Sequence, residues 1–360
     1  MLKIQKNYSL KNDNSFKLDI KADYFVKINN VDELRELSNN KELINLKRLV
    51  IGEGSNVLFR SDYHGLVIKN KIFGKKILFE DNQEIILKIG AGENWHDLVT
   101  WTVSNNWGGI ENLALIPGTV GAAPVQNIAA YGQNFSDIFI SLDAYDFELG
   151  KVTSFTKTGC QFGYRDSIFK KRGKNNLVVV SVQIKLKKNY QLETDYFMLG
   201  LSNDSLKCEL EQIARSPFTV KDVYQAVVNI RRRKLPDVDQ IPSVGSFFLN
   251  PVINKQKLKQ LQKQVTNLQY YPIDQLTYKQ LNDPSFKKED YVKVAAGRLL
   301  DELGWRGKKI GNVSIYDKHA LVIVHNGKAS GQEIYNFAQK VKNDVYEHYG
   351  IKLETEVNII

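Results

Sequence analysis

The chain has 360 residues, of which 42% are hydrophobic and 25% charged, a composition that supports a substantial core divided among two or three domains. Fifty Lys and Arg against forty Asp and Glu give a net charge of +10, which favours an anionic partner such as nucleic acid, an acidic membrane or a phosphorylated small molecule. No apolar run approaches the roughly 20 residues that cross a bilayer, and the start of the chain lacks the apolar stretch of a secretory signal, so we expect a cytoplasmic protein without a membrane partner.

Residues 1–75 alternate short apolar runs with turn residues. The pattern predicts a helix at 32–37 and strands at 49–51, 57–59 and 66–68. A small mixed sheet is the expected structure of this first segment.

Residues 76–220 form a second segment, in which glycine-rich turns separate the predicted elements. We expect a strand at 85–89, a helix at 94–106 and a strand at 177–186. The turns between them carry most of the residues that suggest chemistry.

The third segment, 221–360, opens with a predicted helix at 220–232. Its apolar residues recur at helical spacing, at Val223, Ala226, Val227 and Ile230. Pro236 follows the helix and stops it. The basic run 231–234 at its end is interpreted as a solvated face.

The rest of the third segment has clear elements only near its end. We expect a strand at 320–324, a helix at 331–349 ended by Gly350, and a terminal strand at 352–360. The stretch 255–291 is polar with weak periodicity and is interpreted as a surface excursion.

Cysteine and histidine usage argues against disulfide and metal sites. Cys160 and Cys208 are too few for a disulfide framework and lack the paired spacing of zinc ligands. The histidines, which are scattered without HxH or HxxxH spacing, are His64, His96, His319, His325 and His348. We therefore expect no metal ion.

A first glycine cluster, Gly52-Glu53-Gly54-Ser55-Asn56, lies between two predicted strands. Its glycines allow positive φ, so that backbone N–H groups can converge on a pyrophosphate. Neither G-x-G-x-x-G nor a P-loop pattern is completed here or at 90–93, so neither binding mode is supported. An ordinary tight turn stays open as the alternative.

A longer stretch, 115–132, is dominated by small residues. Such a run permits close approach of the backbone to a large planar ligand, and Asn127 and Tyr131 could hydrogen-bond or stack with it. From these residues alone, a buried structural loop is an equally open interpretation.

Eight sequence blocks occur in a defined order: GEGSNVLF, GAGENWHDLV, ENLALIPGTVGAAPVQNIAAYG, FGYRDSIFK, KLPD, GSFFLNP, AAGRLLDE and LETEV. In these blocks the chain resembles the UDP-N-acetylenolpyruvoylglucosamine reductase family over nearly its whole length. The resemblance implies an α+β fold: a two-lobed FAD-binding domain of the vanillyl-alcohol-oxidase (PCMH) type, with lobes 1–75 and 76–220, and a C-terminal α/β substrate-binding domain, 221–360.

The same resemblance implies the activity. Members of the family use NADPH and FAD to reduce UDP-N-acetylglucosamine enolpyruvate to UDP-N-acetylmuramate, a cytoplasmic step of peptidoglycan precursor synthesis. It also implies that FAD is bound non-covalently. We expect a monomer without a nucleic-acid partner. The residues implied to hold FAD are Gly52, Gly54, Ser55, Asn56, Gly118, Gly121, Asn127, Tyr131 and Gly132.

Three residues match the catalytic positions of the family: Arg165, Ser246 and Glu356. Negative charge accumulates on the enolpyruvyl carboxylate when hydride arrives, so donors or cations are needed there. Ser246 is implied to give a proton to C2, and no G-x-S-x-G pattern surrounds it to support a hydrolase. From the residues alone, Arg165 could instead pair with Asp166, and Glu356 could face solvent.

Three further residues match substrate-binding positions: Tyr196, Lys234 and Asn250. The resemblance implies that Tyr196 contacts the diphosphate. The chain departs from the family pattern at Leu249, at Ala122-Ala123 and at Asn358. Two other functions are alternatives, an alcohol oxidase of the same fold and a basic binding protein. The chain has no recognisable nucleic-acid module to support the second.

Overall fold

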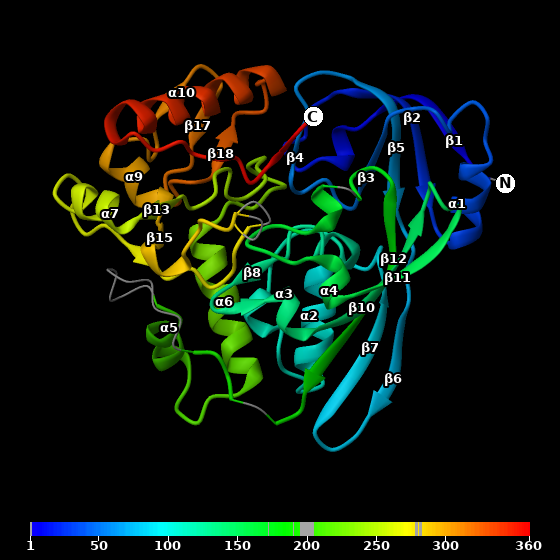
Figure 1. Cartoon of the computed structure of the whole chain (residues 1–360), viewed down its shortest axis with the longest axis horizontal. Coiled ribbons are helices and arrows are strands. Elements are labelled where there is room, and N and C mark those ends of the chain that lie inside the picture. Colours follow the sequence, from blue (N-terminus) through cyan, green and yellow to red (C-terminus); the bar gives the residue numbers. More distant parts are fainter. Residues whose placement is uncertain (1, 172, 190, 195–204, 278–279, 281–282) are drawn as a thin grey trace.

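The computed structural model describes residues 2–171, 173–189, 191–194, 205–277, 280 and 283–360, which form three packed regions (Figure 1). The first region is a mixed sheet in the order β1-β2-β5-β3. β2 and β3 run parallel to β5, and β1 is antiparallel to β2. The predicted mixed sheet is confirmed, with these elements: β1 (Ile4–Ser9), β2 (Lys21–Ile28), α1 (Val31–Ser38), β3 (Arg48–Ile51) and β5 (Tyr63–Asn70).

The second region is an antiparallel sheet in the order β11-β10-β12-β7-β6. Its strands are β6 (Lys75–Glu80), β7 (Glu84–Gly90), β10 (Phe139–Asp146), β11 (Lys151–Thr156) and β12 (Leu177–Lys187). The helices that share its apolar core are α2 (Trp95–Ser104), α3 (Phe135–Ile138), α4 (Lys157–Cys160), α5 (Leu206–Ile213) and α6 (Val220–Lys234).

The helix α6 begins at a capping box formed by Thr219 and Asp222. Its apolar face, which includes Val223, Val227 and Ile230, is buried in the core of the second region. The division of the chain at 75/76 and 220/221 stays a prediction, and this packing favours a second boundary placed after α6.

The third region holds two small sheets, in the orders β13-β15-β14 and β16-β17-β18. Its elements are β13 (Val252–Asn254), α7 (Lys255–Leu261), β14 (Tyr270–Tyr271), β15 (Tyr291–Val294), α9 (Ala296–Glu302), β16 (Lys309–Ile310), β17 (Val313–Ile315), β18 (Ile323–His325) and α10 (Gly331–Tyr349). Phe247, Trp305 and Phe337 share one apolar cluster with Phe16 and Phe25 of the first region. The third region therefore packs on the first, and it also contacts the second, where the N–H of Tyr164 donates to Leu276 O.

The predicted helix at 331–349 is confirmed as α10. Ser330 and Glu333 form a capping box at its start, and Gly350 ends it at φ 64°. Within the described ranges, no helix has the length and apolarity needed to cross a bilayer.

Three predictions for the third region were wrong in part. The stretch 255–291 is no surface excursion, because it contributes β14 and the buried side chains of Leu258, Leu261, Val265 and Leu268. The strand expected at 320–324 is the shorter β18. The strand expected at 352–360 is reduced to β19 (Asn358–Ile359), which pairs in parallel with β4 (Val57–Leu58).

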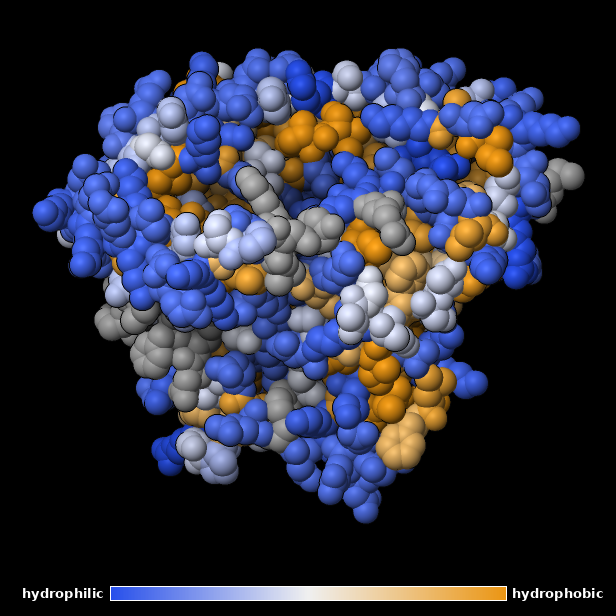
Figure 2. Space-filling view, viewed as in Figure 1, coloured by the Kyte–Doolittle hydropathy of each residue, from blue (hydrophilic) through white to orange (hydrophobic). Residues whose placement is uncertain are grey.

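Apolar side chains are exposed on the edge strand β6. Ile77, Leu78 and Phe79 are each more than 40% exposed, and Figure 2 shows hydrophobic atoms at the lower right, where Figure 1 places β6. Lys75 and Lys76 precede these residues and Glu80 follows them. Charges on an edge strand oppose its pairing with a strand of another chain.

Candidate active site

A cavity of about 330 Å³ lies where the three regions meet. Its wall includes the turn after β3, the loop before β8 (Ala129–Ala130), the start of α2, the end of α6 and the segments around Ser246 and Glu356. Of the residues predicted for the site, the cavity brings together Gly52, Gly54, Ser55, Asn56, Gly121, Arg165, Ser246 and Glu356.

The turn at 52–56 has the form expected of a phosphate nest. Gly54 has φ +66°, and a Cβ atom there would lie 2.1 Å from the carbonyl oxygen of Asp13. Among the described residues, the backbone N–H groups of residues 53–56 have no hydrogen-bond acceptor. Backbone N–H groups without protein acceptors are available to an anionic oxygen, so this turn can bind a pyrophosphate.

The two glycine-rich loops are in direct contact. A Cβ atom on Gly52 would lie 2.5 Å from Thr119 Oγ1. Glu53 joins the loops, since its carboxylate accepts from the backbone N–H of Gly118 at 3.0 Å and from Asn94 Nδ2 at 2.7 Å. Glu53 was not predicted as a site residue. Gly118 itself does not line the cavity.

Arg165 and Glu356 form an ion pair inside the cavity. Arg165 Nε lies 3.1 Å from Glu356 Oε1, and the side chain of Glu356 is only 15% exposed. Asp166 pairs with Lys171 instead. The two alternatives that the sequence left open, an Arg165–Asp166 pair and a solvent-facing Glu356, are therefore not what the structure shows.

Gln126 and Asn56 continue this network. Gln126 Nε2 donates to Glu356 Oε1 at 3.3 Å, and Asn56 Nδ2 donates to Gln126 Oε1. Glu356 Oε1 thus accepts a hydrogen bond from Gln126 and forms the ion pair with Arg165, which leaves Oε2 as the oxygen that can meet a ligand. Gln126 was not predicted as a site residue, although it lies within the recognised block.

Lys170 contacts the backbone of Arg165. Its Nζ donates to the carbonyl oxygen of Arg165 at 3.0 Å, and Arg165 itself has φ +53°, a conformation unusual for a residue other than glycine. Burial lowers the pKa of Lys170, while the neighbouring Asp166 and Glu356 act in the opposite direction. Lys170 also lines the cavity, so it adds a second cation beside Arg165.

Ser246 is held next to Glu356 by backbone pairing. The N–H of Phe247 donates to Leu321 O at 2.8 Å, and the N–H of Glu356 donates to Phe247 O at 2.9 Å. Gly245 precedes Ser246 with φ +76°. Ser246 and Glu356 therefore line the same cavity from adjacent backbone segments.

Arg231, the first residue of the basic run in α6, does not belong to a solvated face. It lines the cavity and donates from Nη2 to Leu115 O at 3.2 Å. Its Nε is buried, and among the described residues it has no acceptor. Burial lowers the pKa of Arg231, the phenol of Tyr131 acts in the opposite direction, and Arg165 lowers it further.

Several predicted residues lie outside the cavity wall. The side chain of Asn127 is buried at 1% exposure and bonds to protein groups. Asn250 Oδ1 accepts from the N–H of Ala296 at the start of α9, at 3.0 Å. Gly132, Tyr131 and Lys234 also do not line the cavity. The predicted Tyr196 lies outside the described residues, and all of these roles stay predictions.

No cluster of three or more His, Cys, Asp or Glu side chains suited to a metal ion occurs within the described ranges. The pKa of His319 reflects the positive charge of neighbouring side chains. Burial, together with Arg306, Lys234 and Arg231, lowers the pKa of His319 to about 4. Positive charge thus gathers near the end of α6, beside the cavity.

Comparison with known proteins agrees with this architecture. Residues 22–156 match the model of an FAD-binding domain, and residues 236–360 match that of the C-terminal domain of UDP-N-acetylenolpyruvoylglucosamine reductase. The chain is 40% identical over 360 residues to the UDP-N-acetylenolpyruvoylglucosamine reductase of Flavobacterium johnsoniae, with 100% of both chains covered. It is 37% identical to that of Burkholderia multivorans, with 99% of this chain and 96% of the relative covered.

Among solved structures, the chain is similar in fold to UDP-N-acetylenolpyruvylglucosamine reductase from Thermus caldophilus. The TM-score is 0.65 at 19% identity, with 100% of this chain and 99% of the other covered. The predicted α+β fold with an FAD-binding domain is confirmed. Because relatives of this identity span the whole chain, it belongs to the UDP-N-acetylenolpyruvoylglucosamine reductase family.

Proposed function

We propose that this chain uses NADPH and FAD to reduce UDP-N-acetylglucosamine enolpyruvate to UDP-N-acetylmuramate, a step of peptidoglycan precursor synthesis. The observation that carries the proposal is the grouping of Arg165, Ser246 and Glu356 around one cavity that is also lined by the glycine turn. Family membership supplies the reaction, and the cavity supplies the residues that can perform it.

The residues that line the cavity suit FAD. The unpaired N–H groups of residues 53–56 suit its pyrophosphate, and the narrow contact of Gly52 with Thr119 holds the two loops together around it. Bound there, FAD would supply the hydride-transfer chemistry between NADPH and the enolpyruvyl group. Within the described part of the chain, no Cys or His side chain lines the cavity, which supports non-covalent binding.

Arg165 is suited to the substrate carboxylate, where negative charge develops as the enolpyruvyl group is reduced. Its guanidinium has a fixed direction, because Nη2 donates to Ala129 O at 2.8 Å and Nε pairs with Glu356. A cation held in place before the reaction stabilises developing charge without reorganising. Lys170 adds a second positive charge on the same wall.

Ser246 is suited to proton delivery. A serine hydroxyl is a weak acid, so it donates to C2 only where its developing alkoxide is stabilised. The cations of Arg165 and Lys170 line the same cavity and provide that stabilisation. Glu356 Oε2, which the ion pair and Gln126 leave available, can accept or share a proton beside Ser246.

The remaining binding roles follow the family pattern as proposals. Tyr196, Lys234 and Asn250 are assigned to the sugar nucleotide, and Arg231 adds a guanidinium group to the cavity wall. We propose a monomer in the cytoplasm, without a nucleic-acid or membrane partner. The charges on either side of the exposed residues of β6 support the monomer, since they oppose edge-to-edge pairing.

The test is the visible spectrum of the purified protein under anaerobic conditions. A yellow protein that NADPH bleaches, and that regains its colour only with UDP-N-acetylglucosamine enolpyruvate, supports the proposal. If the flavin-loaded protein is not reoxidised by this nucleotide, the assigned fold stands and the proposed function is rejected. Bleaching by an alcohol with rapid return of colour in O₂ identifies an oxidase instead.

A further inference from the structure

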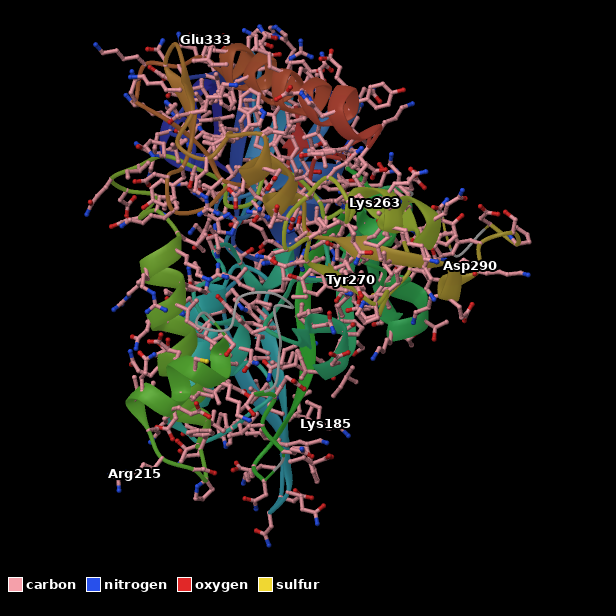
Figure 3. All side chains as sticks on the ribbon, turned by 90° about the vertical axis from the view of Figure 1, so that its left-hand side faces the viewer. Lys185, Arg215, Lys263, Tyr270, Asp290 and Glu333 are labelled. Atoms are coloured by element: carbon pink, nitrogen blue, oxygen red, sulfur yellow. The ribbon has the colours of Figure 1, made fainter. Side chains whose placement is uncertain are left out.

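The segment that follows β14 crosses from the third region to the second. The N–H of Tyr164 donates to Leu276 O at 3.2 Å, and Lys293 Nζ lies 4.5 Å from the centre of the Tyr164 ring. A Cβ atom on Gly163 would lie only 2.4 Å from Leu276 O. In the side view of Figure 3, Asp290 lies at the outer edge of the third region and Tyr270 lies further inward. The segment therefore contacts the backbone immediately before Arg165.

Gln275 makes two hydrogen bonds across this junction. Its Oε1 accepts from Asn127 Nδ2 at 2.9 Å, and its Nε2 donates to Ser136 Oγ at 3.1 Å. Asn127 is buried, and both N–H groups of its amide are used, because Nδ2 also donates to Gly163 O at 3.1 Å, while Oδ1 accepts from the N–H of Ser136 at 3.0 Å. The backbone of Asn127 has φ +43°, which asparagine tolerates better than most residues.

The backbone at Asn127 in turn fixes the direction of Arg165. Arg165 Nη1 donates to Asn127 O at 3.5 Å, and Nη2 donates to Ala129 O at 2.8 Å. These carbonyl groups and Glu356 hold three different nitrogens of one guanidinium. Its orientation is therefore set by the 127–129 backbone as much as by its acidic partner. Gln275 does not line the cavity, so its effect on the reaction is indirect, and its side chain reaches Arg165 through Asn127.

We infer that Gln275 is a positioning residue for Arg165. By hydrogen-bonding to Asn127, it makes the orientation of the Arg165 guanidinium depend on the docking of the third region. The inference rests on the proposed function and assigns a role within it. Without the Gln275 amide, one buried N–H of Asn127 has no acceptor, and a buried donor in that state drives local rearrangement. The carbonyl groups that hold Arg165 then shift, whereas the glycine turn at 52–56 is unaffected.

The test compares Gln275→Leu, Gln275→Glu and the wild type as full-length, flavin-loaded proteins. Flavin reduction by NADPH and its reoxidation by the enolpyruvyl nucleotide are followed separately by stopped-flow absorbance. Gln275→Leu slows reoxidation at saturating nucleotide by tenfold or more and leaves reduction within twofold, because only reoxidation needs the carboxylate to meet Arg165. Gln275→Glu keeps reoxidation within threefold, because a carboxylate accepts from both Asn127 Nδ2 and Ser136 Oγ.

A matched control is Gln264→Leu, the same change at an exposed glutamine of the third region, which leaves both rates unaltered. Should Gln275→Leu fail to fold, Gly163→Ala tests the same junction by displacing Leu276, and it slows reoxidation selectively. Unchanged reoxidation, equal slowing of both half-reactions, or a Gln275→Glu protein as slow as Gln275→Leu overturns the inference. If the wild type itself is not reoxidised by the nucleotide, the proposed function fails instead.

Discussion

Replacement of Gln126 tests whether the hydrogen bonds that join Asn56, Gln126 and Glu356 contribute to the rate of the reaction. Gln126→Leu removes the donor to Glu356 Oε1, which lies 3.3 Å away. Hydrogen bonds to charged groups contribute about 1.5–3 kcal/mol, and a bond longer than the usual ~2.7–2.9 Å of charge-assisted pairs belongs at the low end. The expected loss of about 1.5 kcal/mol corresponds to a roughly tenfold slower reoxidation of the flavin by the nucleotide.

Gln126→Glu provides a sharper version of the same test. It places a second carboxylate beside Glu356, and two unit charges about 3.3 Å apart repel by about 5 kcal/mol at an effective dielectric of about 20. The variant is therefore slower than Gln126→Leu near pH 8 and recovers as the pH falls, because protonation of either carboxyl relieves the repulsion.

Stopped-flow reoxidation between pH 5 and 8 measures both effects, with Gln264→Leu as the control. The reasoning is refuted if Gln126→Glu is as fast as Gln126→Leu at every pH, or if its rate rises with pH.

Three further changes test other parts of the site. Ser246→Ala leaves reduction by NADPH nearly intact and slows reoxidation by about 10²–10⁴-fold, the usual contribution of a general acid; equal slowing of both half-reactions rejects the role. Gly52→Ala drives a methyl group against Thr119 Oγ1 and costs about 1–3 kcal/mol of stability; its flavin content falls in absorbance measurements and is restored by adding Thr119→Ala, and a double variant as poor as Gly52→Ala counts against a steric cause. His319, whose pKa burial lowers to about 4, takes up its proton more readily when unfolded, so stability is present above pH 6.5 and falls between pH 6.5 and 4, by up to about 1.4 kcal/mol per pH unit. In urea unfolding, His319→Gln loses less free energy of unfolding than the wild type as the pH falls, and an equal loss in the two proteins excludes His319 as its source.

Local signals in the sequence predicted local structure well. Ser330 with Glu333, and Gly350 nineteen residues beyond the start of α10, define that helix because caps act within a few residues. The glycine turn at 52–56 was recognised for the same reason. The stretch 255–291 was misjudged because its few apolar residues, including Leu258 and Leu261, are embedded among many Lys and Gln.

The partners of the site residues could not be predicted in this way. Nothing near Arg165 in sequence indicates that it pairs with Glu356 rather than with Asp166, since the pairing depends on the packing of two regions. The sequence does indicate that Arg231 is buried, because it continues the buried row of Val223 and Val227 at spacings of four. A basic residue on the apolar face of a helix indicates a buried partner or ligand more strongly than a basic run does.

The pairing of β19 with β4 has a consequence for how the cavity forms. The backbone N–H and the side-chain Nδ2 of Asn358 both donate to Asn56 O, at 3.1 and 3.2 Å, so the glycine turn is held by residues far along the chain. Contacts of such long range form late in folding, and the cavity is complete only when all three regions have assembled. A cofactor that binds this cavity and not the unfolded chain adds its binding free energy to the assembled state. Flavin occupancy in a preparation of this protein is thus a measure of completed folding as well as of catalytic competence.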